Sequence, residues 1–126
     1  MEDRPLMDKL GVRPGQRVAV LGIEDPAFMA ALRARAADVS TRRRKDCDLV
    51  FVAAATREDL ESLRELRGDI KPDGAIWVVR RKGKQATLKE VQVIEAGLAA
   101  RMVDNKIASF SDTHGAMRLV IRLVDR

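Results

Sequence analysis

The chain has 126 residues, 46% of them hydrophobic, so it is long enough to bury one core and too short for two. One cysteine and one histidine exclude an internal disulfide and a structural zinc site, and 3% aromatic residues leave few rings for stacking on nucleic-acid bases. The net charge of +5 is modest, so solvated surface charge is favoured over a nucleic-acid footprint. We expect a single domain over residues 1–126.

The first half of the chain alternates helix and strand patterns. A short amphipathic helix is expected over Arg4 to Leu10, and a strand over Arg17 to Leu21. Asp25 followed by Pro26 is typical of an N-cap and the first helical position, so a helix should begin there.

The placement of the next segment is ambiguous. Val39 to Thr41 predicts either a short strand or an irregular segment, because few residues separate it from the apolar run Leu49 to Ala54. A parallel crossover normally needs about a dozen residues or more. The continuous run itself is typical of a strand that helices cover on both faces.

The middle of the chain carries clear boundary signals. Thr56 is expected to cap a helix that ends at Gly68, and its inner face should comprise Leu60, Leu63 and Leu66. The sequence Lys71 to Gly74 predicts a turn into a strand over Ala75 to Val79.

The last third predicts one helix and a hairpin. Thr87 with Glu90 forms a capping-box pattern for a helix that continues through Val91, Ile94 and Leu98 around Gly97. Met102 to Phe110 and Met117 to Val124 predict antiparallel strands joined by a turn over 111–115. The chain is therefore expected to be a Rossmann-like α/β fold, with a mostly parallel sheet, flanking helices and a C-terminal antiparallel hairpin.

Three segments resemble the class I S-adenosylmethionine-dependent methyltransferases. Gln16 to Gly22 resembles their first strand and its glycine turn, Asp46 to Val52 their fourth strand, and Ile70 to Trp77 the turn into their fifth. This resemblance implies a reduced methyltransferase-like fold, with S-adenosylmethionine as the cofactor of an authentic member.

Nearly the whole chain is also similar to a family of small bacterial domains of unknown function. The similarity is carried by Lys9 to Arg17, Glu95 to Ala99, and the pair Val103 and Asp104. It implies no active-site residues.

The methyltransferase pattern is incomplete where the cofactor would bind. The segment Gly22 to Pro26 has one glycine, whereas the family usually has several. Ser40 to Arg42 stands where an acidic residue would hold the ribose hydroxyls, and there is no room for the family's third strand. We therefore expect one wall of the cofactor pocket to be missing, and a dinucleotide site is disfavoured.

Two groups of residues are candidates for binding. The carboxyl ends of parallel strands form the ligand crevice of open α/β sheets, and a rim of basic loops could lie beside it. The crevice candidates are Gly22, Ile23, Glu24, Ala53, Ala54 and Thr56, and the basic rim candidates are Arg42, Arg43, Arg44, Arg80, Arg81, Lys82 and Lys84.

Other chemically active residues are better explained as structural. His114 is expected to be a turn residue, because it has no identifiable titratable partner. Cys47 between Asp46 and Asp48 should have a raised pKa that discourages nucleophilic use, and Trp77 should lie in the core. No catalytic residue and no metal site is predicted.

Three functions from different classes remain. The favoured one is a non-catalytic binding or regulatory domain, with an unidentified small ligand or protein partner. The alternatives are an S-adenosylmethionine-dependent methyltransferase with a degenerate cofactor loop, and an anion or nucleic-acid binder working through the basic loops. We expect a cytoplasmic protein without a membrane span, and pairing of the hairpin edge would allow a homodimer.

Overall fold

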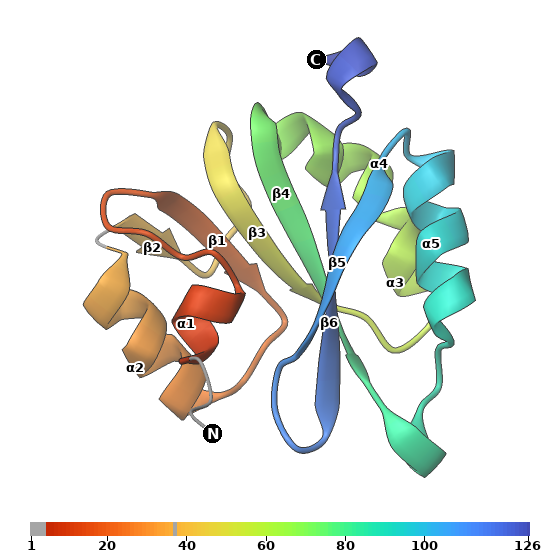
Figure 1. Cartoon of the computed structure of the whole chain (residues 1–126), viewed down its shortest axis with the longest axis horizontal. Helices are drawn as coiled ribbons and strands as arrows, with labels where there is room; N and C mark the ends of the chain where they lie inside the picture. The colour runs from red at the N-terminus through yellow and green to blue at the C-terminus, as the bar shows by residue number, and fades with distance from the viewer. Residues whose placement is uncertain (1–4, 37) are drawn as a thin grey trace.

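The computed structural model describes residues 5–36 and 38–126, which form a six-stranded sheet with helices on both faces (Figure 1). The elements in chain order are α1 (Leu6–Lys9), β1 (Arg17–Leu21), α2 (Pro26–Arg35), β2 (Asp38–Ser40), β3 (Cys47–Ala53), α3 (Arg57–Glu61), α4 (Leu63–Leu66), η1 (Arg67–Asp69), β4 (Ile70–Arg81), η2 (Gly83–Gln85), α5 (Glu90–Ala99), β5 (Val103–Ser109), β6 (His114–Val120) and η3 (Leu123–Asp125).

The strand order is β2-β1-β3-β4-β6-β5. The first four strands in that order run parallel, β6 is antiparallel to β4, and β5 is antiparallel to β6. The predicted Rossmann-like sheet with a C-terminal hairpin is therefore confirmed.

Two hydrophobic clusters fill the two faces of the sheet. One cluster packs the sheet against α1 and α2 and contains Phe28, Phe51 and Trp77. The other packs it against α3, α4 and α5. Because both faces of β3 and β4 are buried, the apolar runs of these strands are continuous, as the sequence predicted.

Trp77 fastens α1 to the centre of the sheet. Its side chain is fully buried, and its indole Nε1 donates to the backbone carbonyl of Leu10, 3.0 Å away. Burial of an indole is favourable only when its N–H finds an acceptor. The predicted core role of Trp77 is confirmed.

The predicted turn over Lys71 to Gly74 is instead a bulge inside β4. Ile70 pairs with Cys47 and Ala75 pairs with Leu49, so β4 carries extra residues in this interval. A Cβ atom on Gly74 would lie 2.9 Å from the Cys47 carbonyl oxygen and 3.0 Å from that of Asp48. The turn-forming residues of this segment thus lie where the backbones of β3 and β4 approach closely.

The ambiguous segment after α2 is a strand. Asp38–Ser40 pairs in parallel with β1, from Arg17 opposite Asp38 to Ala19 opposite Ser40. β2 therefore ends level with Ala19, before β1 reaches its carboxyl end at Leu21.

The helix caps are confirmed in part. Asp25 accepts from the Phe28 amide and Thr56 accepts from the Asp59 amide, as predicted for N-caps. Thr87 is not a cap, because α5 begins later and the Thr87 hydroxyl donates to the Ala55 carbonyl over 2.6 Å. Gln92 instead accepts from the Lys89 amide at the start of α5.

The helix expected to continue through Val91, Ile94 and Leu98 is α5, and other residues of this helix face the sheet. Val91 and Leu98 are 52% and 56% exposed, whereas Val93 and Gly97 are the residues that face the sheet. Gly97 lets the helix approach closely, since a Cβ there would lie 3.1 Å from the Leu119 side chain.

The second strand of the hairpin begins and ends earlier than predicted. His114 opens β6 and Val120 ends it, while Val124 lies in η3 and is exposed. Within the described part of the chain, none of the helices has the length and apolar character that a membrane span requires.

The close approach at Gly74 predicts that Gly74→Ala destabilises the fold by about 1–3 kcal/mol, because the added methyl group meets three backbone carbonyls. Chemical denaturation measures this free energy of unfolding. Gly68→Ala is the matched control, since a Cβ there meets only the Lys45 ammonium at 3.7 Å. Equal stability of the two variants would contradict a backbone contact at Gly74.

Candidate functional site

A hollow of about 390 Å³ lies at the carboxyl ends of β1, β3 and β4. This is the edge at which open α/β sheets bind ligands, and the volume lies within the range of small-molecule sites. The opposite wall is the tip of the hairpin between β5 and β6. The residues that line the hollow are Gly22, Ile23, Glu24, Asp25, Pro26, Ala53, Val79, Phe110, Ser111, Thr113 and His114.

The turn after β1 forms one wall of the hollow. Gly22 has φ +75°, a left-handed conformation that favours glycine, and it turns the chain towards α2. The Asp25 carboxylate is engaged in capping α2. Glu24 is exposed, and none of the described residues makes a hydrogen bond or an ion pair with it. The turn therefore presents one unengaged carboxylate to the hollow.

The hairpin tip forms the other wall and is held by short-range hydrogen bonds. The Ser111 hydroxyl accepts from the His114 amide over 3.1 Å, and the Thr113 hydroxyl lies 2.7 Å from Nδ1 of His114. His114 is half-buried, and its ring orientation is fixed by Thr113 rather than by a carboxylate. The imidazole can therefore bind a ligand, but it lacks the acidic partner of an activated base.

The structure brings together four of the six predicted crevice residues, Gly22, Ile23, Glu24 and Ala53. Ala54 is buried, with its amide donating to the Val79 carbonyl, and Thr56 caps α3, so neither lines the hollow. The residues that the sequence analysis missed come from the hairpin, chiefly Phe110, Ser111 and Thr113. The Gly-containing turn beside His114 was the one local signal for them.

The wall that β2 would supply is absent from the described lining of the hollow. β2 stops at Ser40, level with Ala19, and the chain then turns back towards the amino end of β3. The hollow is therefore bounded by the turn after β1 and by the hairpin tip.

The first basic cluster, Arg42 to Lys45, lies at the amino end of the sheet, and three of its four side chains are held in ion pairs. Arg43 Nε is 2.8 Å and Lys45 Nζ 3.1 Å from the carboxylate of Asp69, whose side chain is only 2% exposed. Arg43 holds the pKa of Asp69 below its ordinary value, chiefly through this hydrogen bond. Arg44 pairs with Asp38 and donates to the Val18 carbonyl.

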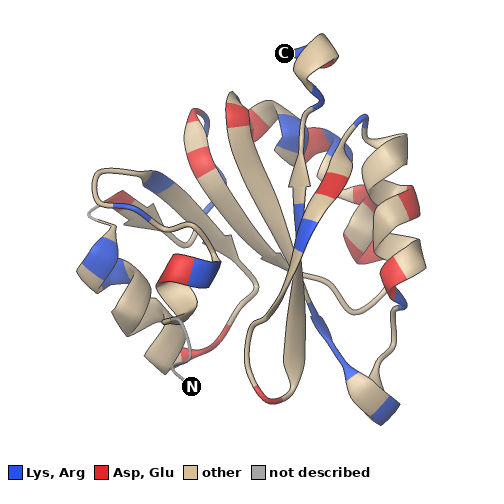
Figure 2. Ribbon diagram, viewed as in Figure 1, with Lys and Arg blue, Asp and Glu red and all other residues tan. Residues whose placement is uncertain are grey.

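The second basic cluster, which comprises Arg80, Arg81, Lys82 and Lys84, lies at the other end of the sheet (Figure 2). Arg80 and Arg81 end β4, so this cluster does lie at the carboxyl edge. Arg80 is partly engaged by Glu90 at 3.3 Å and the Leu88 carbonyl, and Lys82 donates to Ser109. The expectation of one basic rim built from both clusters is wrong, because the chain from β2 to β3 returns to the amino edge.

Cys47 is a buried thiol, and its predicted raised pKa has a different cause. Burial is the main factor that raises the pKa of the thiol, whereas Arg44 and Arg17 lower it. Asp48 adds only a smaller raising effect. Among residues 5–36 and 38–126, no group of three or more histidine, cysteine or acidic side chains could hold a metal ion.

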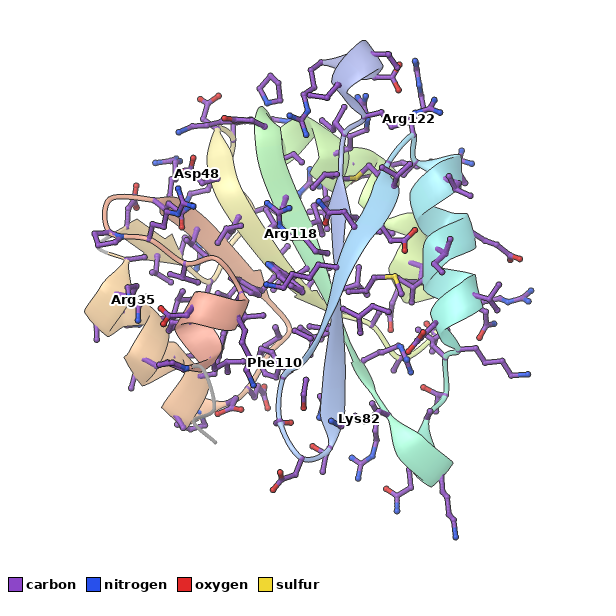
Figure 3. The ribbon with its side chains drawn as sticks, viewed as in Figure 1. Arg35, Asp48, Lys82, Phe110, Arg118 and Arg122 are labelled. Atoms are coloured by element: carbon purple, nitrogen blue, oxygen red, sulfur yellow. The ribbon has the colours of Figure 1, made fainter. Side chains whose placement is uncertain are left out.

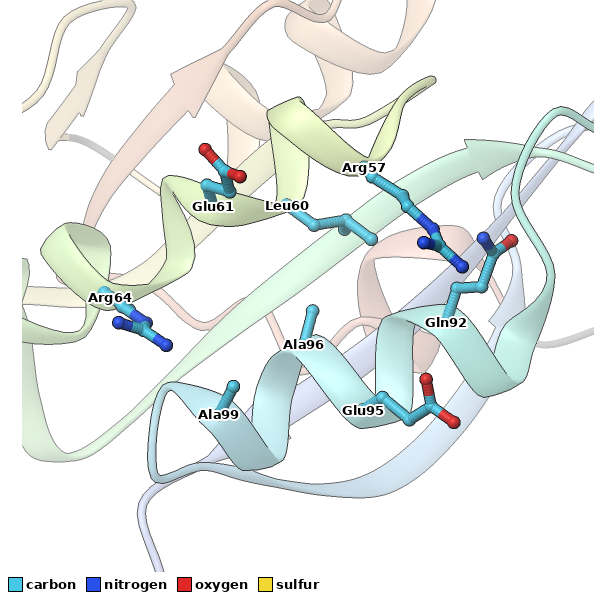
Figure 4. Close-up of a pocket in the computed structure, with 8 residues that line it drawn as sticks. All are labelled: Arg57, Leu60, Glu61, Arg64, Gln92, Glu95, Ala96 and Ala99. Carbon is cyan, nitrogen blue, oxygen red and sulfur yellow. The ribbon is translucent and has the colours of Figure 1, made fainter.

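Another hollow, of about 570 Å³, is a furrow between α3, α4 and α5 (Figure 4). Its apolar residues are Leu60, Ala96 and Ala99. Two arginines and two glutamates balance its charge, and it lies between helices that cover one face of the sheet. It therefore has no feature that selects a ligand.

Comparison with solved structures shows the fold. A SAM-dependent methyltransferase from Aquifex aeolicus matches with a TM-score of 0.69 and 15% identity, covering 93% of this chain and 88% of that one. A TehB-like SAM-dependent methyltransferase from Corynebacterium glutamicum matches with a TM-score of 0.59 and 12% identity, covering 93% and 85%. Fibrillarin from Aeropyrum pernix with natively bound S-adenosyl-L-methionine matches with a TM-score of 0.58 and 13% identity, covering 86% and 68%.

No family model matches this chain, and no curated protein matches it in sequence. The structural likeness therefore establishes a Rossmann-like, methyltransferase-like fold and leaves the function to be argued from the site. The similarity to small bacterial domains stays a prediction.

The buried carboxylate of Asp69 predicts that Asp69→Ala lowers the free energy of unfolding by about 1–3 kcal/mol at pH 7. A carboxylate whose folded pKa is lowered stabilises the fold above its unfolded pKa of about 3.9, and this stabilisation is lost as the pH falls through the folded pKa. Chemical denaturation at neutral and acidic pH should show the difference narrowing in acid.

Glu65→Gln is the control for this prediction. Glu65 also pairs with Arg43, but its side chain is 72% exposed, so its loss should cost less than about 0.5 kcal/mol. An Asp69→Ala variant as stable as the wild-type protein would contradict a structural role for the first basic cluster. So would a difference in the free energy of unfolding that persists unchanged in acid.

Proposed function

We propose that this protein is a non-catalytic ligand-binding domain of methyltransferase-like fold, and that it holds a small ligand in the carboxyl-edge hollow. One observation carries the proposal. The hollow lies where open α/β sheets bind ligands, yet its second wall is the hairpin tip and not the end of β2. The scaffold thus retains a binding position while lacking the usual cofactor wall.

The charges of the hollow indicate the class of ligand. Glu24 and Asp25 give one wall a negative potential, and the other wall offers hydroxyl groups and the His114 imidazole. A phosphate or carboxylate placed there would be repelled by the two acids. The hollow is therefore best suited to a small ligand that carries an amine together with hydroxyl groups.

The polar groups of the hollow also favour binding over catalysis. Asp25 is engaged in capping α2, and Ser111 and Thr113 are engaged in the hairpin tip. No carboxylate among the described residues is hydrogen-bonded to His114. Thr113 orients the imidazole, but it does not supply the negative charge with which a carboxylate activates a histidine as a general base.

An S-adenosylmethionine-dependent methyltransferase is the second candidate, because the fold of this chain is similar to those of the solved structures named above. The left-handed Gly22 would let the methionyl part of the cofactor approach the backbone. The ribose would find no acidic residue at the end of β2, since Ser40 and Thr41 follow there. The described residues therefore fit only part of the cofactor.

The third candidate, an anion or nucleic-acid binder that uses both basic clusters, lacks the shared rim on which it depends. The two clusters lie at opposite ends of the sheet, and the first is occupied by Asp38, Glu65 and Asp69.

Calorimetric titration with S-adenosylmethionine and S-adenosylhomocysteine distinguishes the first two candidates. We expect no saturable heat with either compound at concentrations up to about 1 mM. The binding free energy would then be weaker than about −4.1 kcal/mol, the value for a Kd of 1 mM. Thermal denaturation in the same buffer should show no shift in Tm. Single-site binding in the micromolar range would overturn the non-catalytic proposal and support the methyltransferase.

The charge of the hollow gives a separate test. Titration with putrescine, a small diamine, should shift backbone amide resonances of residues 22–25 and 111–114 in NMR spectra. Glu24→Lys should abolish these shifts through charge reversal, whereas Glu61→Lys, in the furrow between α3 and α5, should leave them unchanged. Shifts that survive Glu24→Lys would show that the hollow does not bind by its carboxylates.

A further inference from the structure

A second polar cavity, of about 360 Å³, lies on the same face of the sheet as α1. It opens between the end of α1, the start of β3 and the strands β4, β5 and β6. Four cationic side chains line it, Lys9, Arg13, Lys106 and Arg118, together with two acidic ones, Asp48 and Asp73. The cavity is thus cationic, unlike the carboxyl-edge hollow.

Arg118 is the residue that the fold does not explain. It lies in β6 opposite Trp77 of β4 and Lys106 of β5, and its neighbours Leu119 and Met117 are buried. Arg118 itself is half-buried, and no described residue makes a hydrogen bond or an ion pair with its guanidinium. Figure 3 labels Arg118 near the middle of the sheet, where β6 runs between β4 and β5.

Two other partly buried arginines are held by carboxylates. Arg35 lies 2.7 Å from the Asp8 carboxylate, and Arg44 lies 2.6 Å from that of Asp38. Burial lowers the pKa of Arg118, and repulsion by Arg126 lowers it further, so its surroundings disfavour the charge. A half-buried cation without a partner is costly, and a bound anion would offset that cost.

A backbone contact positions one of the other cations, Lys106, at the cavity. Lys106 Nζ donates to the Lys9 carbonyl over 2.7 Å, which links β5 to the end of α1. The pairing of β5 with β6 shifts between Asp104 and Lys106. This bulge lies next to Lys106, which lines the cavity. Next to Lys9, the Leu10 carbonyl accepts a hydrogen bond from the Trp77 indole.

The acidic residues of the cavity do not neutralise these cations. Asp48 is engaged by Lys71 Nζ at 3.1 Å and by the Arg17 amide at 2.8 Å. Asp73 lines the cavity, but it makes no ion pair with Arg118. The charge that faces the cavity therefore remains positive.

We propose that this cavity binds the oxyanion group of a small ligand, a phosphate or a carboxylate, with Arg118 as its principal donor. The five N–H groups of a guanidinium form a planar fork that pairs with two oxygens of such a group at once. Lys106 and Lys9 add charge at the rim. This site is separate from the carboxyl-edge hollow and does not depend on the function proposed for it.

The fluorescence of Trp77 can report binding, because it is the only tryptophan of the chain and lines the cavity. The protein is titrated with inorganic phosphate and, separately, with acetate, at constant ionic strength maintained with sodium chloride. We expect a saturable change with at least one of the two anions, and the tighter one identifies the oxyanion class.

Arg118→Gln should weaken this binding by about tenfold or more, which corresponds to the loss of a charged hydrogen-bonding partner. Arg122→Gln is the matched control, because it removes the same charge from a residue that pairs with Asp125 outside the cavity. A control with unchanged affinity beside a weakened Arg118→Gln supports the site.

Two results would overturn the proposal: no saturable response to either anion, or equal affinity of Arg118→Gln and the wild-type protein. Should Arg118→Gln fail to fold, as far-ultraviolet circular dichroism would show, Lys106→Gln and Lys9→Gln replace it. These side chains lie at the rim, and each substitution is expected to weaken binding severalfold by removing one charge. Unchanged affinity in both would equally refute the site.

Discussion

The antiparallel pairing of β6 with β4 determines where both cavities lie. Residues Ala75 to Val79 of β4 are all buried, so the register of β6 against this strand cannot slip without exposing one face of the hairpin. That register sets His114 opposite Arg81 at the carboxyl edge, and Arg118 opposite Trp77 in the middle of the sheet. One strand therefore supplies a residue to each site.

Ion pairing separates the charges that maintain the fold from those that are available to a ligand. Asp69 is buried between Arg43 and Lys45, and Asp38 is held by Arg44, so the dense basic run before β3 is structural. Glu24 and Arg118 have no such partner among the described residues. A formal charge count of the chain cannot reveal this difference, because it depends on which side chains meet.

Local signals in the sequence predicted most elements but only part of the sites. Asp25 and Thr56 act on amides three residues away, so their capping roles follow from sequence alone. His114 meets the Gly22 turn only through the register of the hairpin, which composition and spacing do not encode. The bulge at Gly74 was misread as a turn, because the same residue types serve both.

Opposite charges at the two sites imply separate ligands, or separate parts of one ligand. His114 and Arg118 are four residues apart in β6 and face the same side of the sheet, so they lie about 13 Å apart. The buried Ala116 lies between them and closes the direct path along the strand. A small molecule with adjacent amine and oxyanion groups is too short to occupy both sites. Because the hollow repels the anions that the second cavity attracts, occupancy of each site can be controlled independently by the charge of the ligand.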